Sequence, residues 1–99
     1  MMSNSKLTWT DATGPTLPDG YFVQMSDQGF EAIADPVDEI PVADDFWNRN
    51  VGYGVETVTL GGLIPEVVYY FKIFSYRGIG KDVVYKINGS VPEVSVMAR

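Results

Sequence analysis

The side chains that most often carry out catalysis are scarce in this sequence. The 99-residue chain contains no histidine and no cysteine, which removes the commonest general base, the commonest metal ligand and all thiolate chemistry. Its serine and threonine hydroxyls would need a lysine or a carboxylate as base, and no Gly-x-Ser-x-Gly segment is present. We therefore expect no catalytic residues and no enzymatic activity.

Two glycine-containing segments resemble sites at first sight. Arg77-Gly78-Ile79-Gly80-Lys81 suggests a phosphate loop, but it lacks the spacing and the following helix that such loops need. Asn88-Gly89-Ser90 matches a glycosylation sequon, although Asn-Gly is also typical of a tight turn. We interpret both segments as turns and expect no cofactor.

Acidic side chains are concentrated between residues 27 and 45, where lysine and arginine are absent. Carboxylate oxygens are the ligands that Ca²⁺ prefers, but their spacing here matches no calcium-binding loop. We interpret the segment as a solvated acidic loop, with a calcium site as the alternative, and assign no metal ligands. The acidic residues are Asp27, Glu31, Asp35, Asp38, Glu39, Asp44 and Asp45.

The length of the chain predicts a single domain over residues 1–99, with residues 1–6 disordered or forming a strand stub. A hydrophobic content of 45% with 20% charged residues is typical of a globular domain. The net charge of −6 argues against binding to nucleic acid or to anionic membrane surfaces. No apolar run approaches the roughly 20 residues of a membrane-spanning helix, and the first six residues lack a signal-peptide layout.

Apolar and polar residues alternate with a period of two in several segments, which is typical of β-strands. We predict strands at residues 7–10, 21–25, 55–60, 67–76 and 92–98, with a short strand or turn at 31–34 and irregular structure from there to residue 50. An all-β fold follows. The inward-facing positions predict a core made of Trp9, Tyr21, Val23, Val58, Leu60, Leu63, Tyr69, Phe71 and Ile73.

Two groups of residues resemble the fibronectin type III family. The segment 63–69, Leu-Ile-Pro-Glu-Val-Val-Tyr, is similar to the family's Leu-x-Pro-x-Thr-x-Tyr corner, in which the tyrosine hydroxyl bonds to backbone a few residues upstream. Trp9 followed by Tyr21-x-Val23 is similar to the core tryptophan and tyrosine of two successive strands. The resemblance covers residues 7–98 and implies an immunoglobulin-like antiparallel β-sandwich with a long irregular middle loop.

This resemblance has two departures. Val67 stands where the family has threonine, at the cost of a local hydroxyl contact. Only eight residues precede Trp9, so the first strand of the family is expected to be short or missing. The strand over residues 7–10 would then have an open edge that invites pairing with another chain. Because residues 3–6 are polar and include Lys6, we expect a monomer, with a weak dimer as the alternative.

Several segments resemble fibronectin type III domains from secreted multidomain proteins of Bacteroidetes-type bacteria: residues 19–23 (Asp-Gly-Tyr-Phe-Val), 69–74 (Tyr-Tyr-Phe-Lys-Ile-Phe) and 36–38 (Pro-Val-Asp). This implies an extracellular or cell-surface location within a parent protein. It also implies a non-catalytic accessory role, as a spacer or an interaction module beside neighbouring domains. The alternative is a specific glycan- or protein-binding module. The family's integrin-binding Arg-Gly-Asp is not carried over, because this chain reads Arg77-Gly78-Ile79.

Aromatic side chains offer the only candidate contact surface. If Tyr69 and Phe71 face the core, alternation turns other aromatics of the same sheet outward. Exposed aromatics on one sheet are typical of protein or sugar contacts. The alternative, which we favour, is that the middle loop folds over them with its own Phe46 and Trp47. The candidate surface comprises Phe22, Tyr70, Phe74, Tyr76 and Trp47.

Overall fold

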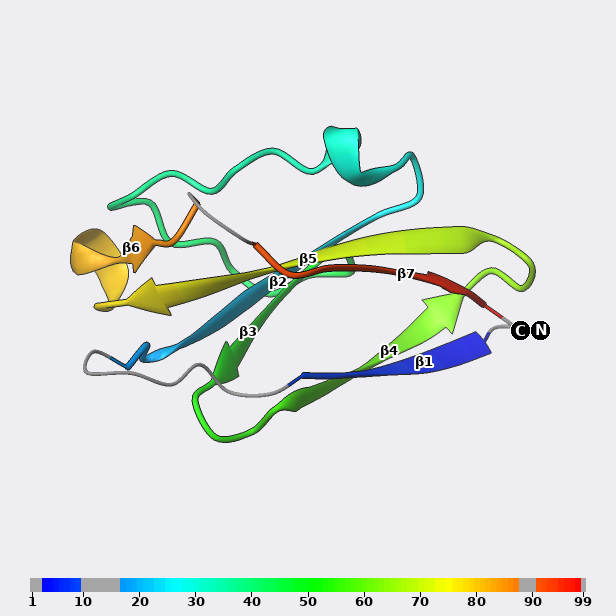
Figure 1. Cartoon of the computed structure of the whole chain (residues 1–99), viewed down its shortest axis with the longest axis horizontal. Helices are drawn as coiled ribbons and strands as arrows, with labels where there is room; N and C mark the ends of the chain where they lie inside the picture. Colours follow the sequence, from blue (N-terminus) through cyan, green and yellow to red (C-terminus); the bar gives the residue numbers. More distant parts are fainter. Residues whose placement is uncertain (1–2, 10–16, 88–90, 99) are drawn as a thin grey trace.

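The chain folds into two antiparallel β-sheets packed face to face (Figure 1). The computed structural model describes residues 3–9, 17–87 and 91–98. The smaller sheet pairs β1 (Ser3–Thr8) with β4 (Thr57–Leu63). The larger sheet has the order β3 (Asn48–Gly52), β2 (Gly20–Ser26), β5 (Val68–Arg77) and β6 (Val84–Tyr85), with β7 (Glu93–Met97) also paired to β5. The all-β prediction is confirmed.

The centre of the larger sheet is the long pairing between β2 and β5. It extends from Gly20 opposite Tyr76 to Ser26 opposite Tyr70. Both strands are rich in aromatic and β-branched residues, which suit a pleated, buried surface. The other edge of β5 is shared: β6 pairs with its last two residues, and β7 pairs with positions 68–72.

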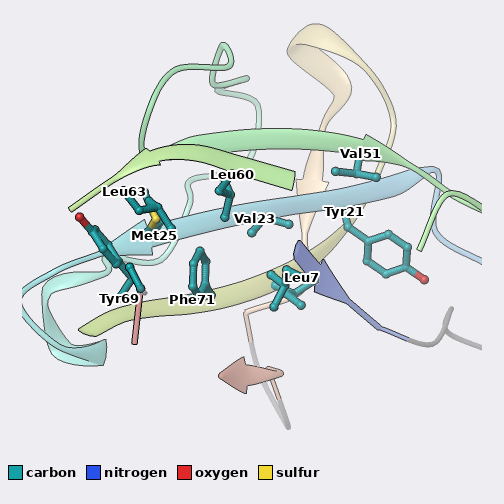
Figure 2. Packing of buried hydrophobic residues seen from close by; sticks show 11 residues of the cluster. Leu7, Tyr21, Val23, Met25, Val51, Leu60, Leu63, Tyr69 and Phe71 are labelled. Atoms are coloured by element: carbon teal, nitrogen blue, oxygen red, sulfur yellow. The ribbon is translucent and has the colours of Figure 1, made fainter. Parts of the chain in front are cut away.

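The main core lies between the two sheets. Figure 2 shows Leu60 and Leu63 of β4 pointing toward Val23, Met25 and Phe71 of the larger sheet. The predicted core residues all belong to this cluster, in which Trp9 and Val58 are partly buried and the others fully buried. Period-two alternation therefore placed the inward face of each strand correctly. The fully buried members are Leu7, Tyr21, Val23, Met25, Val51, Leu60, Leu63, Tyr69, Phe71, Ile73 and Ala98.

A second core covers the opposite face of the larger sheet. Phe22 and Phe74 lie at its centre, and Ile33 and Val83 of the connecting segments and Tyr85 of β6 pack against them. The rings of Phe22 and Tyr85 lie 5.6 Å apart. As a result β2 and β5 are buried on both faces, an arrangement more usual in the central strands of parallel sheets.

Several elements differ from the sequence prediction. The first strand was expected at residues 7–10 and occupies Ser3–Thr8, a 3₁₀ turn at Phe30–Ala32 lies where a short strand or turn was expected at 31–34, and β6 was not predicted. Irregular structure was expected through residue 50, but β3 occupies Asn48–Gly52 and pairs with β2. Strand β4 was expected to end before Gly61-Gly62, yet it continues through both glycines to Leu63. The pairing with β1 shifts between Ser3 and Ser5, so the two glycines oppose a single residue. The φ of Gly62 is 73°, in the left-handed region that a glycine in a β-bulge supplies.

Both ends of the described chain lie at the same pole of the molecule (Figure 1). Ser3 pairs with Leu63 at the end of β4. The N–H of Ala98 donates to the carbonyl of Val67 at the start of β5, at 3.0 Å. Only the short turn between β4 and β5 separates these two anchoring points. Residues 3–6, expected as disorder or a stub, contribute to β1 from Ser3 onward; Met1 and Met2 are outside the described residues.

Candidate contact surface

The aromatic residues proposed from the sequence do not form one surface. Phe22 and Phe74 are 0% exposed, so neither can touch a partner. Tyr70 and Tyr76 are half-buried on the same face, and only Trp47 is exposed. The proposal of an outward aromatic sheet face is therefore wrong, because this face of the sheet is covered by other parts of the chain.

The cover is the segment 27–45, which we call the acidic strap. Its Phe30 packs edge-to-face on Tyr70 at 5.1 Å, and its Ile33 is buried in the second core. Backbone and side-chain bonds tie it to the other edge of the sheet: Glu39 N–H donates to Val83 O at 2.7 Å, and Tyr85 N–H donates to Asp38 Oδ1 at 2.9 Å. The strap thus covers the sheet, as the favoured alternative predicted.

The aromatic residues expected to hold this loop down are, however, the wrong ones. The middle loop was expected to fold over this face with its own Phe46 and Trp47. Instead they are 37% and 40% exposed, and Lys72 pairs with Glu93 of β7 at 3.6 Å. Phe30 and Ile33 fill the position that the sequence analysis gave to Phe46 and Trp47.

Phe46 and Trp47 form what we call the aromatic corner, at the point where the strap enters β3. The two rings lie 4.7 Å apart with an interplanar angle of 90°, an edge-to-face contact. A Cβ built on Gly62 would lie 3.7 Å from the ring of Phe46, so this ring sits over the glycine bulge of β4. Phe46 therefore connects the segment that enters β3 of the larger sheet with β4 of the smaller sheet.

Asp45 fixes the backbone of the aromatic corner. Its Oδ1 accepts hydrogen bonds from the N–H of Trp47 at 2.8 Å, the N–H of Asn48 at 2.9 Å and Asn48 Nδ2 at 2.9 Å. Its own N–H donates to the carbonyl of Asn48 at 2.9 Å. These bonds, that from the Asn48 side chain first and that from the Trp47 backbone second, lower the pKa of Asp45 below its usual 3.8. The carboxylate stays ionised and holds the turn.

Asp44 bonds to Asn50 much as Asp45 bonds to Asn48. Its Oδ1 accepts from the N–H and the side-chain amide of Asn50, at 2.9 and 2.7 Å. The Asn50 amide also donates to the carbonyl of Val42 at 2.7 Å. Together the two aspartates accept hydrogen bonds from the outward-pointing N–H groups of Asn48 and Asn50 in β3. These N–H groups would otherwise be available to pair with another strand. This edge of the larger sheet is capped by the chain itself.

The tyrosine corner predicted from the sequence is present. The hydroxyl of Tyr69 accepts a hydrogen bond from the N–H of Ile64, five residues upstream, at 2.9 Å. Tyr69 is fully buried and belongs to the main core. The prediction of a buried tyrosine bonded to upstream backbone is confirmed.

The turn at residues 77–82 is shaped by glycine and by Asp19. A Cβ on Gly78 would lie 2.3 Å from the carbonyl oxygen of Asp82, so no other residue fits without a backbone shift. The Gly78 N–H donates to Asp19 Oδ2 at 2.7 Å. The tip residue, Ile79, is 84% exposed. The segment is a tight turn, and Asn88-Gly89-Ser90 lies outside the described residues.

The acidic strap does not gather its carboxylates into a metal site. Among the described residues, no three Asp or Glu side chains lie close enough together to hold an ion. Within the same residues no helix is long and apolar enough to cross a membrane. The strap's seven acidic residues are all exposed, and two of them, Asp44 and Asp45, directly precede the aromatic corner.

A local sequence signal for the aromatic corner was overlooked. Asp44-Asp45 followed by Asn48 and Asn50 is typical of side chains that bond to nearby backbone and fix a turn. Aromatic residues inside such a turn are held in place without being buried. Comparisons with known proteins add nothing to this picture: no family model, curated protein or solved structure matches the chain.

Proposed function

We propose that this chain is a fibronectin type III-like, non-catalytic accessory module of a larger exported bacterial protein. The observation that carries the proposal is the hydrogen bond between the Tyr69 hydroxyl and the Ile64 backbone, since it closes the corner on which the family resemblance rests. The edge-to-face contact of Trp9 and Tyr21, with centroids 5.5 Å apart, supports it further. The role as spacer or interaction module beside neighbouring domains comes from that resemblance.

The sheet order is a second support. A two-stranded sheet, β1–β4, faces a larger sheet in which β3, β2, β5 and β7 are adjacent. A fibronectin type III sandwich without its first strand would have this arrangement. The edge of β1 that faces away from β4 has no strand paired with it among the described residues, as such a sandwich would leave it.

The aromatic corner favours a second function, a specific glycan- or protein-binding module. Phe46 and Trp47 are exposed, adjacent and fixed by Asp45, although burial would be the usual fate of two such large apolar side chains. Exposed aromatics of this kind are enriched at protein contacts. This contact role belongs to the corner, and no longer to the sheet face.

Calorimetry on residues 1–99 tests the accessory-module proposal. An accessory module folds by itself, so we expect one cooperative transition whose calorimetric and van't Hoff enthalpies agree. Trp47→Ala is expected to leave that transition in place, because the corner contributes little to either core. A broad transition, or one that requires another segment of polypeptide to appear, would contradict the proposal.

A further inference from the structure

We infer that the aromatic corner and the acidic strap together bind an extended basic polypeptide segment, with a lysine or arginine of the partner on the ring face of Trp47. The inference rests on the contact role proposed above and specifies its partner. Its starting point is that Phe46 and Trp47 are exposed while the backbone of Trp47 is fixed by Asp45 and the two rings contact each other, so that binding would order little additional backbone.

The geometry of the two rings favours a cation over a sugar. A flat sugar ring stacks best on an open and broad aromatic face. At the corner the rings are perpendicular, so that Phe46 and Trp47 do not offer one continuous plane. A lysine or arginine needs only a single ring face, and tryptophan has the strongest attraction for cations among the aromatic side chains.

The charge around the corner favours the same partner. Asp44 and Asp45 precede the two aromatic residues directly, and both carboxylates are exposed. Each uses Oδ1 for the bonds that hold the turn, so the charge remains close to Trp47. The remaining five acidic residues of the strap are exposed farther along the segment, as far as the β6 edge of the sheet, and no basic residue lies among them. Arg49 of β3 offsets part of the charge of Asp45, so the net negative charge comes from the strap as a whole. Such a field attracts a basic partner and increases its rate of association.

The same charge argues against a second copy of this chain. Two molecules, each with a net charge of −6, would bring their acidic straps together at a shared corner. Like charges placed opposite one another oppose association. Backbone pairing at this edge is also blocked, since Asp44 and Asp45 already occupy the N–H groups of Asn48 and Asn50. The partner therefore binds through side chains and not by adding a strand to β3.

Tryptophan fluorescence provides the test. In a Trp9→Phe background, Trp47 is the only tryptophan left. The probe is a synthetic peptide in which lysine alternates with leucine, and the matched control replaces each lysine with glutamate. The lysine peptide is expected to shift the Trp47 emission in a saturable manner. Raising the salt from about 50 to about 500 mM is expected to weaken its binding severalfold, because exposed charges are screened.

Variants separate the aromatic contribution from bulk charge, with binding measured by calorimetry. Trp47→Ala retains every carboxylate and is expected to weaken binding about tenfold or more, as truncation of a central tryptophan typically does. Ile79→Ala removes a more exposed apolar side chain at a distant turn and is expected to change nothing. The double variant Asp44→Asn, Asp45→Asn keeps an oxygen acceptor for each turn but removes two charges, and is expected to weaken binding severalfold.

Three results would overturn the inference. Equal binding of the lysine and glutamate peptides would exclude charge recognition. Equal binding to the parent and to Trp47→Ala would show non-specific attraction to an acidic protein. A response of Trp47 to a linear oligosaccharide but not to the lysine peptide would identify the corner as a sugar site. Each of these results contradicts the binding inference alone, and the accessory-module proposal stands as long as the protein still unfolds cooperatively. Loss of cooperative unfolding would count against the accessory-module proposal instead.

Discussion

At the scale of single residues, Tyr69 shows how one hydroxyl group joins two parts of the fold. Its ring fills the main core beside Phe71, while its oxygen accepts the N–H of Ile64 in the turn between β4 and β5. The bond was expected from the resemblance of residues 63–69 to the corner of fibronectin type III domains, and its partner lies five residues upstream of the tyrosine. Without that resemblance, the spacing of leucine, proline and tyrosine would not have identified the partner of the hydroxyl.

Replacing Tyr69 with phenylalanine removes the hydroxyl and keeps the ring. We expect Tyr69→Phe to lower the free energy of unfolding by about 1–3 kcal/mol, because the hydrogen bond from the Ile64 N–H to the buried tyrosine is lost. Urea denaturation measures the change. Ile79→Ala, at a side chain that is 84% exposed, is the control and is expected to change stability by less than about 0.5 kcal/mol. A Tyr69→Phe protein as stable as the parent would show that the hydroxyl is dispensable.

Asp45 makes the turn before β3 sensitive to acid. Its pKa in the folded chain lies below 3.8, chiefly because of the bonds from Asn48 and Trp47. The stabilisation is therefore fully present above the ordinary pKa and is lost as the pH falls through the lower, folded value. We expect the stability of Asp45→Asn to fall less than that of the parent between neutral pH and about pH 3. Identical acid profiles for the two proteins would contradict this.

At the scale of whole elements, β3 is a strand that the sequence did not predict. Its sequence, Asn-Arg-Asn-Val-Gly, contains only one apolar residue, so no alternation is visible. The strand forms because β2 pairs with one edge and the carboxylates of Asp44 and Asp45 bond to the other. Tertiary pairing thus outweighs weak strand propensity, and a single sequence does not reveal that pairing.

The alternation in β2 and β5 was easier to interpret, but its outward face was not. Phe22 and Phe74 were correctly assigned to the face opposite the main core, and the strap then buried them. The sequence could not show which loop residues would do so, because Ile33 and Phe30 lie in a segment without a period. Period-two patterns identify the two faces of a strand and not what covers each of them.

The second core should be as important for stability as the first. Phe22→Ala would leave a cavity among Phe74, Tyr85 and Ile33, so we expect it to cost about 3–5 kcal/mol. Thermal unfolding measures the loss, and Ile79→Ala is the exposed control, expected to cost less than about 0.5 kcal/mol. If Phe22→Ala were as mild as the control, the strap would have to be loosely attached in solution.

At the scale of the whole molecule, the two ends of the described chain lie at one pole and not at opposite poles. The other pole contains the turns at residues 53–56 and 77–82. The molecule measures 42 Å along its longest axis, which runs along the strands in Figure 1. Neighbouring domains attached at either end would therefore meet at one pole and leave the other free.

This arrangement determines how the molecule would respond to mechanical tension. A force applied between residues 3 and 98 acts across the two sheets and not along the strands, so it peels β1 from β4 and β7 from β5, starting at one pole. Hydrogen bonds, each with a modest net energy, would then break one after another. A force between residues 79 and 98 instead runs along β5 and β7 and loads many bonds together.

Optical-tweezers experiments can compare the two directions, because the chain has no cysteine and handles can be attached at introduced cysteines alone. We expect a lower unfolding force between residues 3 and 98 than between residues 79 and 98. Equal forces would show that the sheets resist separation as strongly as the strands resist shear. With the expected order, tension applied through the two ends of the described chain would open this domain at a lower force than tension applied along its strands.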